Sequence, residues 1–217
     1  MRGIAILHED PDVIVIAKAA GVLSCATRRG GDEYCVEAAL TDYVRKGQAR
    51  SRKCVYLVHR LDRETSGVMM VAKTPEVQEY FRSNWNDLTE KTYLARVEGR
   101  LADKEGAFES YLAEDPRTLK VHSVKDPAKG KLARTLYRVI SVDGATSLVE
   151  VRLKSGRKNQ IRVHFAESGH PVVGDARYGH GGGALMLHSW KLAFVHPHSG
   201  EKMQFEAPPP PFASAAR

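Results

Sequence analysis

Short runs of β-branched residues separated by tight turn signals constrain the fold of this chain more than any other feature. Residues 4–18 (IAILHEDPDVIVIAK) contain two such runs around the turn Glu9-Asp10-Pro11-Asp12. Residues 135–153 (TLYRVISVDGATSLVEVRL) contain another two around Asp143-Gly144, a strong hairpin signal. Both stretches predict pairs of neighbouring antiparallel strands.

The rest of the chain adds more strands than helices. Alternation and β-branched residues predict strands within residues 54–62, 67–73, 91–99, 184–197 and 202–208. A 3.6-residue period predicts helices within 35–47 and 159–169, and Thr74-Pro75-Glu76 is typical of a helix start. We expect an α+β fold with a mixed, mainly antiparallel central sheet flanked by helices and loops.

Length and composition favour a single cytosolic domain. The chain has 217 residues, of which 42% are hydrophobic, enough for one large core. We expect one domain over residues 1–217, with 207–217 as a proline-rich, partly flexible tail. No charged-then-apolar leader and no apolar run near the ~20 residues of a membrane span occur, so we expect a cytoplasmic protein without a membrane partner. Cys25, Cys35 and Cys54 are expected to be reduced thiols.

The charge favours a polyanionic partner. Lys and Arg outnumber Asp and Glu by 33 to 26, and the pI is near 9.3. The excess gathers in three places: Arg45, Lys46, Arg50, Arg52 and Lys53; Lys125, Lys129, Lys131 and Arg134; and Lys154, Arg157, Lys158 and Arg162. Any one cluster could simply keep a loop soluble, whereas three favour phosphate contacts.

Three candidate chemistries fit the sequence poorly. The loop GHGGG at 179–183 is similar to an esterase oxyanion loop, but no G-x-S-x-G elbow accompanies it. His188, His196 and His198 match no usual zinc spacing and have no acid among them, so we expect structural or hydrogen-bonding roles and no metal. LDRET at 61–65 is similar to an aspartyl-phosphatase loop, but no paired carboxylates follow as magnesium ligands.

The stretch HRLDRETSG at 59–67, on an expected turn between two strands, is more specific. It resembles the H-R-L-D-x-x-T-S-G signature of the RluA-like RNA pseudouridine synthases at all seven fixed positions. KTYLARVEG at 91–99 is similar to the family's K-x-Y-x-A-x-V-x-G strand. Residues 153–179 and 185–212 resemble its G-R-x-H-Q-I-R and closing L-H-A and H-P segments. The resemblance therefore covers residues 4–212.

The chain departs from the family pattern at three places. Lys18-Ala19-Ala20-Gly21 replaces K-P-x-G, which should alter rigidity more than chemistry. Ser155 replaces a common Thr, and Asn159 replaces a common His, which is expected to shift RNA contacts. The resemblance implies a stand-alone catalytic domain without the S4 RNA-binding domain that many relatives carry.

The resemblance implies an isomerase that converts uridine to pseudouridine without a cofactor. Asp62 is the implied catalytic carboxylate, and Arg162 is expected to pair with it and favour its charged form. Tyr93 is expected to stack on the flipped uracil and to help remove the C5 proton, the alternative being a core tyrosine. Arg60 is expected to enter the RNA stack in place of the flipped base. The residues expected to contact RNA are His59, Arg60, Arg63, Thr65, Arg157, Lys158, Gln160 and Ile161.

The implied partner is structured RNA, and a metal is not required. Relatives of this kind act on transfer RNA, on large-subunit (23S-type) ribosomal RNA, or on both. A monomer is the default expectation. Two other hypotheses remain open at this point: a non-catalytic RNA-binding module, for which an acid amid basic loops would be unfavourable, and an aspartyl-nucleophile phosphatase.

Overall fold

The structure is a computed structural model, and it describes residues 1–26, 33–48 and 50–213. These residues form two compact units, Met1–Thr89 with Ser189–Pro208 and Glu90–His188 with Pro209–Arg217. The expectation of a single catalytic domain stays a prediction. Residues 27–32, 49 and 214–217 lie outside the described residues. The last of these ranges is part of the proposed tail.

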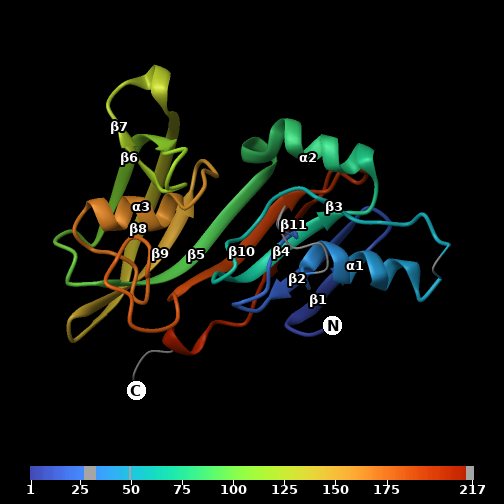
Figure 1. Ribbon diagram of the computed structural model, residues 1–217, viewed down its shortest axis with the longest axis horizontal. Helices are drawn as coiled ribbons and strands as arrows, with labels where there is room; N and C mark the ends of the chain where they lie inside the picture. Colours follow the sequence, from blue (N-terminus) through green and yellow to red (C-terminus); the bar gives the residue numbers. More distant parts are fainter. Residues whose placement is uncertain (27–32, 49, 214–217) are drawn as a thin grey trace. The chain divides into compact units, whose positions relative to one another are not determined.

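The first unit is built on a sheet whose strands follow the order β1-β2-β4-β10, in which β1–β2 and β2–β4 are antiparallel pairs (Figure 1). These strands are β1 (Ile4–Glu9), β2 (Val13–Lys18), β4 (Ser66–Ala72) and β10 (Leu187–Val195). The short β3 (Tyr56–Leu57) pairs with β4, and β11 (Lys202–Glu206) pairs with β10. The β1–β2 hairpin is confirmed, and its turn is closed by Asp10, whose Oδ1 accepts the N–H groups of Asp12 and Val13 at 2.8 Å each.

Two helices belong to this unit, and both begin or end where the sequence predicts. Helix α1 (Val36–Arg45) ends in a left-handed Lys46, followed by Gly47 with φ +74°. Helix α2 (Pro75–Leu88) begins after Thr74, whose hydroxyl accepts the N–H of Val77 at 3.3 Å. The buried stripe of α2 packs on one face of the sheet, against residues of β2, β4 and β10.

The second unit is an antiparallel sheet in the order β5-β9-β8-β6-β7 (Figure 1). Its strands are β5 (Thr89–Glu98), β6 (Glu105–Glu114), β7 (Val121–Val124), β8 (Lys131–Asp143) and β9 (Thr146–Leu153). The Asp143-Gly144 hairpin is confirmed, with Asp143 opposite Thr146. Strands β6 and β7 were not predicted, because β6 carries Glu, Gly and Ser at positions that strands usually give to β-branched residues.

Helix α3 (Gln160–Glu167) covers one face of the second sheet. Ile161 and Phe165 pack there against Ala95 and Val97 of β5 and against Val149 and Val151 of β9. Two 3₁₀ turns, η1 (Pro127–Lys129) and η2 (Pro211–Ala213), complete the described elements. The carbonyl of Phe212, within the proposed tail, accepts hydrogen bonds from the Arg96 guanidinium at 2.8 and 3.2 Å. The α+β sheet fold agrees with the prediction.

Candidate active site

Asp62 lies in the first unit on a loop between β3 and β4, and the backbone of this loop is held at successive residues. Ser24 Oγ donates to the carbonyl of Leu61 at 2.7 Å and accepts its N–H at 3.1 Å. The carbonyl of Asp62 accepts the N–H of Thr65 at 3.1 Å, and the carbonyl of Arg63 accepts the N–H of Gly21 at 2.8 Å. The backbone carbonyls of the three consecutive residues 61 to 63 therefore all accept hydrogen bonds. These bonds fix the backbone position from which the half-buried Asp62 side chain extends.

His59 and Thr65 are parts of the support of this loop. His59 Nε2 accepts the backbone N–H of Met70 in β4 at 3.0 Å, and its ring stacks on Trp85 of α2 with centroids 4.7 Å apart. Thr65 is only 2% exposed. The contacts of the half-buried His59 and the burial of Thr65 indicate that both residues hold the loop, and direct RNA contact by either stays a prediction.

Gly67 explains why the signature ends in glycine. It has φ +115°, and a Cβ at this position would lie 2.0 Å from the carbonyl oxygen of Ser189 in β10. Such an approach is far inside van der Waals contact, and the backbone conformation is one that L side chains rarely adopt. Glycine is needed here so that the start of β4, directly after the Asp62 loop, can lie close to Ser189 of β10.

Arg60 and Arg63 are exposed on either side of Asp62. Arg63 Nε donates to the carbonyl of Gly21 at 3.3 Å, and Arg60 Nη1 lies 4.0 Å from Cys25 Sγ. Both guanidinium groups are placed to meet solvent or a polyanion. Insertion of Arg60 into an RNA stack stays a prediction.

The departure at Ala19 has a structural account. The N–H of Ala19 donates to the carbonyl of Gly3 at 2.8 Å, which continues the β1–β2 pairing by one bond. A proline has no N–H and could not make this bond. This chain therefore replaces the rigid ring of the family pattern with a hydrogen bond.

Arg162 lies in the second unit, where α3 holds it almost buried against Asp175. Its Nε and Nη2 donate to the two oxygens of the Asp175 carboxylate at 2.7 and 2.8 Å, a bidentate pair. Its guanidinium also lies 5.2 Å from the centre of the Tyr178 ring. Sequence reasoning missed Asp175 as a partner, although it stands in the family-like Gly-Asp pair of residues 174–175. The expected pairing of Arg162 with Asp62, which lies in the first unit, stays a prediction.

The environment of Asp175 keeps its carboxylate ionised. Burial by itself would raise the pKa of Asp175, but hydrogen bonds from Arg162 and from the N–H groups of Arg177 and Tyr178 outweigh burial, so the pKa is lowered. A charged acid on one edge of the guanidinium fixes the orientation of Arg162.

Gln160 is the centre of a buried hydrogen-bond network at the start of α3. Its Oε1 accepts from Ser155 Oγ at 2.8 Å and from the N–H of Arg157 at 3.0 Å. Its Nε2 donates to the carbonyl of Arg134 at 3.0 Å and to Thr135 Oγ1 at 2.9 Å. Gln160 is 2% exposed, so its amide is satisfied by the protein itself. With Ile161, which is 4% exposed, it holds the turn; contact of either with RNA stays a prediction.

The two other departures keep the chemistry of this turn. Ser155 retains a hydroxyl, which donates to Gln160 and accepts the N–H of Arg134 at 2.9 Å. Asn159 has φ +53°, a left-handed conformation that Asn tolerates, and its Oδ1 accepts the Tyr178 hydroxyl at 3.2 Å. The neighbouring cations lie at or near the surface: Arg157 Nε donates to the carbonyl of Leu132 at 3.0 Å, and Lys158 forms an ion pair with Glu114.

Tyr93 lies on β5 opposite Val151 of β9, half-buried against the hydrophobic cluster of the second unit. It shares a strand face with Ala95 and Val97, as the alternation predicts. Lys91, two residues earlier and 7% exposed, was not predicted as notable. Its burial, with a contribution from Lys154, lowers the pKa of Lys91 to about 8.

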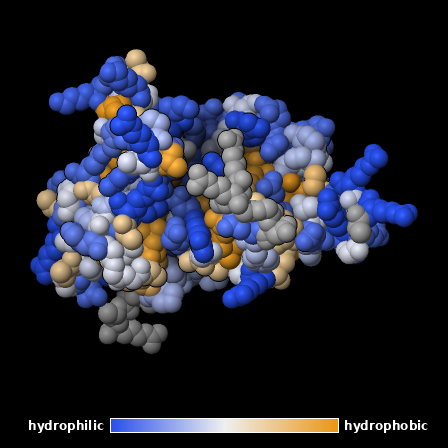
Figure 2. All heavy atoms as spheres, in the orientation of Figure 1, coloured by the Kyte–Doolittle hydropathy of each residue, from blue (hydrophilic) through white to orange (hydrophobic). Residues whose placement is uncertain are grey.

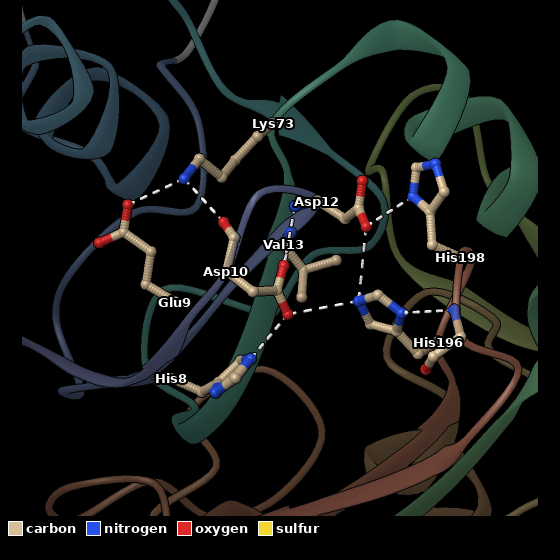
Figure 3. Close-up of polar contacts among 9 residues, drawn as sticks. His8, Glu9, Asp10, Asp12, Val13, Lys73, His196 and His198 are labelled. Carbon is tan, nitrogen blue, oxygen red and sulfur yellow. Dashed lines mark hydrogen bonds and ion pairs between the residues drawn. The ribbon is translucent and has the colours of Figure 1, made fainter.

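The C-terminal histidines meet two acids that come from the β1–β2 turn (Figure 3). His196 Nε2 lies 3.3 Å from Asp10 Oδ2 and 3.5 Å from Asp12 Oδ2, and His198 Nδ1 lies 2.7 Å from Asp12 Oδ2. The hydrogen-bonding roles expected for these two histidines are confirmed; His188 is buried in β10. The sequence shows no acid among these histidines, so it did not predict their contacts with Asp10 and Asp12. Asp10 and His196 are far apart in sequence.

Within the described part of the chain, one group of side chains could hold a metal ion. It consists of Asp10, Asp12 and His196, whose ligand atoms all lie within 4.8 Å of one another. However, the N–H of Ser199 donates to His196 Nδ1 at 3.1 Å, so the imidazole proton sits on Nε2, between the carboxylates. A metal on Nε2 would require the proton on Nδ1, where this donor opposes it. The arrangement therefore suits hydrogen bonds between the imidazole and the two carboxylates.

Cys25, Cys35 and Cys54 are free thiols. Within residues 1–26, 33–48 and 50–213, no helix combines the length and the apolar character needed to cross a membrane.

Comparison with known proteins gives the class of this chain. The model of the RNA pseudouridylate synthase family matches residues 12–167. The chain is 37% identical to an uncharacterized RNA pseudouridine synthase of Bacillus subtilis, over 94% of this chain and 72% of the relative. It is 32% identical to the dual-specificity RNA pseudouridine synthase RluA of Yersinia pestis, over 93% and 97%. It is 34% identical to ribosomal large subunit pseudouridine synthase D of Nitrosomonas europaea, of which it spans 62%.

A solved structure agrees in fold. Human RNA pseudouridylate synthase domain containing 4 superposes with a TM-score of 0.76 at 24% identity, covering 96% of this chain and 89% of that one. The chain belongs to the RNA pseudouridine synthase family. The resemblance to its RluA-like members is confirmed.

Proposed function

We propose that this protein converts specific uridines in structured RNA to pseudouridine, with Asp62 as the catalytic carboxylate. The observation that carries the proposal is the complete signature loop, whose carbonyls at 61 to 63 are all hydrogen-bonded around a half-buried acid. Family membership gives the reaction class. A loop held at this many points supports the positioning that bond cleavage requires.

The proposed reaction needs no external group. The C1′–N1 bond breaks, the uracil turns, C5 joins C1′, the proton leaves C5, and N1 takes up a proton, so the product is an isomer of the substrate. An ionised Asp62 supplies the negative charge that attacks the nucleoside or stabilises positive character on the ribose, as carboxylates do in glycoside hydrolysis. Attack at C1′, attack at C6 and removal of the C2′ proton to give a glycal all use this same carboxylate.

We assign supporting roles to Tyr93, Arg162 and Arg60. The target base must leave the stack before C1′ and N1 can react, which costs a few kcal/mol and favours uridines in loops. Tyr93 stacks on the flipped uracil and assists the loss of the C5 proton, while the Arg162 cation favours the charged form of Asp62. The exposed Arg60 fills the vacated place in the RNA.

The proposed substrates are stem-loops of transfer RNA, of large-subunit ribosomal RNA, or of both. The names of the similar proteins, a dual-specificity RNA enzyme and a ribosomal large subunit enzyme, support this range. Exposed cations of the second unit also support it, since Lys125, Lys129, Lys131 and Arg134 lie around η1 and the start of β8. Hydrophilic residues (blue) gather over this region in Figure 2. We further propose a cytoplasmic monomer.

The decisive experiment maps pseudouridines in total RNA from cells with and without the protein. Sites that disappear should return with the wild-type chain but not with Asp62→Asn, while purified Asp62→Asn should still bind the mapped stem-loop. Asp42→Asn, which changes an exposed acid of α1, is the matched control and should restore the sites. Pseudouridine formation by Asp62→Asn would refute the assignment.

A metal chelator separates the phosphatase alternative. An aspartyl-nucleophile phosphatase depends on magnesium and should lose its activity in EDTA. We expect pseudouridine formation by this protein to continue at an unchanged rate in EDTA. Hydrolysis of a phosphate ester that EDTA abolishes, without pseudouridine formation, would favour the phosphatase.

A further inference from the structure

The segment that leads from α1 towards β3 carries a concentrated positive charge to which the proposed function gives no role. We call residues 45–53 the basic connector; position 49 lies outside the described residues. Its cations are Arg45, Lys46, Arg50, Arg52 and Lys53. No acid occurs in the sequence between Asp42 and Asp62, so no neighbour along the chain neutralises this charge.

The structure also leaves these cations without acidic partners. Within residues 1–26, 33–48 and 50–213, none of the five forms an ion pair. The two other basic clusters are partly neutralised, through the ion pairs Lys129–Asp126, Arg134–Glu109 and Lys158–Glu114. The basic connector is therefore the cluster whose charge is most available to an external anion.

Glu9 is an acid near the basic connector, and it already has a cation of its own. Its carboxylate accepts hydrogen bonds from Lys73 at 2.9 Å and from Tyr43 at 2.8 Å. The hydrogen bond from Lys73 is the main cause of the lowered pKa of Glu9, and attraction to Lys46 contributes least. Glu9 therefore does not neutralise the connector.

Hydrogen bonds hold the basic connector in a compact loop and keep its charges together. Arg45 Nε donates to the carbonyl of Lys53 at 3.0 Å, so the first cation closes the loop onto the last. Inside it, the N–H of Gln48 donates to the carbonyl of Arg45 at 3.0 Å, and the N–H of Ser51 donates to that of Gln48 at 2.9 Å. The cations are exposed, except for the half-buried Arg45. Figure 1 shows the connector beyond the end of α1, and hydrophilic residues (blue) protrude there in Figure 2.

The strand pairing places the basic connector away from Asp62. Strand β4 begins at Ser66, just after the Asp62 loop, and runs to Ala72. Tyr56, the first residue of β3, lies opposite Ala72. The connector thus joins the sheet at the opposite end of β4, a strand about 20 Å long at ~3.3 Å per residue. A phosphate bound at the connector is not that of a nucleotide flipped towards Asp62.

The chemistry of the basic connector fits the phosphates of RNA. Three of its cations are arginines, whose planar guanidinium groups bind phosphate oxygens in pairs. Its sequence, RKGQARSRK, contains no large apolar residue, so it lacks the anchor with which basic segments enter a membrane surface. RNA is also the polyanion that the proposed reaction brings to this protein.

We propose that the basic connector is a second RNA-binding surface, which holds the phosphate backbone of the stem several base pairs from the target uridine. This inference rests on the proposed function, which brings a stem-loop to Asp62. At roughly 3 Å per base pair, the length of β4 corresponds to about six pairs. The stem therefore contributes to affinity through the connector, whereas the chemical step at Asp62 does not depend on it.

The first test is the triple variant Arg50→Gln, Arg52→Gln and Lys53→Gln, which removes three exposed charges and keeps the carbonyl that Arg45 binds. Its affinity for a mapped stem-loop is measured over a series of KCl concentrations. Each lost phosphate contact should lower the slope of log affinity against log salt by about 0.9. We expect the slope to decrease in magnitude by about 2 to 3, and affinity at about 0.1 M KCl to fall at least tenfold.

A second triple variant, Arg2→Gln, Arg82→Gln and Lys202→Gln, is the matched control. It removes the same charge from exposed positions scattered over the first unit, before β1, in α2 and at the start of β11. The slope should change by less than about 1. Equal losses in the two triple variants, or wild-type affinity in the connector variant, would overturn the proposal. So would unchanged RNA affinity beside lost binding to phosphatidylserine vesicles, which would assign the surface to a membrane.

The reaction rate distinguishes a binding surface from a part of the catalytic machinery. Single-turnover rates are measured at saturating protein with uridine tritiated at C5, where released tritium reports loss of the C5 hydrogen. The connector variant should react within about threefold of the wild-type rate, because only affinity was changed. A loss of more than about tenfold at saturation would contradict the proposal.

Stem length provides an independent readout. Shortening the stem of the same RNA to about three G·C pairs should weaken wild-type binding at least tenfold and leave the connector variant almost unaffected. An equal effect on both proteins would overturn the proposal. If the connector variant does not fold, as judged by circular dichroism, the wild type decides: affinity that does not depend on stem length would refute the second surface.

Asp62→Asn separates failure of this proposal from failure of the proposed function. The three connector changes should reduce the salt dependence of RNA binding equally with Asp62 or Asn at position 62. If they do so while Asp62→Asn still forms pseudouridine, the surface stands and the proposed function is wrong. If they have no effect while Asp62→Asn is inactive, the function holds and only the role of the connector is wrong.

Discussion

The buried pair between Arg162 and Asp175 gives a sharp prediction about stability. The Arg162 side chain is 9% exposed and that of Asp175 is 0% exposed, and two hydrogen bonds of 2.7 and 2.8 Å join them. Asp175→Asn keeps the shape of the side chain and removes its charge. The Asn amide has one oxygen that can accept a guanidinium N–H, and its NH₂ group faces the other N–H and cannot accept it. At least one of the two hydrogen bonds is therefore lost.

The expected destabilisation is about 3 kcal/mol. Breaking a buried ion pair by removing one partner costs roughly 3–5 kcal/mol, because a charge stays buried without compensation. The lower end applies, since the Asn oxygen can still accept an N–H of Arg177 or Tyr178, which bond Asp175 at 2.9 and 3.0 Å. For a chain of this size, about 3 kcal/mol corresponds to a decrease in Tm of roughly 6–12 °C.

Glu150→Gln is the control that makes this prediction refutable. Glu150 is also a nearly buried acid with arginine partners, but the side chains of Arg138 and Arg152 are 61% and 64% exposed. Water can solvate these cations after the acid is lost, so we expect a loss of at most about 1 kcal/mol. Urea unfolding followed by circular dichroism measures both variants. Equal losses of unfolding free energy in the two variants would show that burial of the arginine does not determine the cost of removing its acidic partner.

Three further predictions concern the same elements. Arg162→Ala should slow pseudouridine formation far more than it weakens RNA binding; a loss of affinity alone in single-turnover assays would make Arg162 a phosphate contact. Gly67→Ala should destabilise the protein by several kcal/mol or prevent folding, because the new Cβ meets the Ser189 carbonyl at 2.0 Å; an unchanged urea midpoint would contradict this. Because the pKa of Asp175 is lowered from 3.8, its contribution to stability is complete above about pH 4 and is lost as the pH falls through the lowered pKa. Urea midpoints between about pH 5 and pH 2 should show this loss in the wild type and much less of it in Asp175→Asn.

The elements that the sequence predicted are those with local signals. The β1–β2 and β8–β9 hairpins carry turn residues between alternating runs, and α2 begins at a threonine cap followed by proline. Strand β6 carries no such signal. Its residues alternate between partly buried and exposed positions, and it is defined by pairing with β7 and β8. Pairing with distant strands does not leave a mark in a short window of sequence.

The candidate site shows the same division between local and distant signals. The signature at 59–67 and the Q-I-R turn identified Asp62 and Arg162 as residues of interest, because each motif is contiguous. Partners far along the chain were missed: Asp175 for Arg162, and Lys18 for the Asp62 loop, where its Nζ donates to the carbonyl of Arg63 at 3.2 Å. Nothing in the residues around Lys18 says that its amine is buried, since lysines usually keep their charge in water.

The sequence by itself determined the family, the reaction class and the local order of strands and helices, because contiguous motifs and periodicity express short-range chemistry. Only the tertiary structure decided which groups are buried and which distant residues share a hydrogen bond. Those contacts give Lys18 and Asp175 their shifted pKa values and bring Asp10 and Asp12 to His196. The physical reason is that desolvation and charge pairing depend on distance in space, which separation along the chain does not specify.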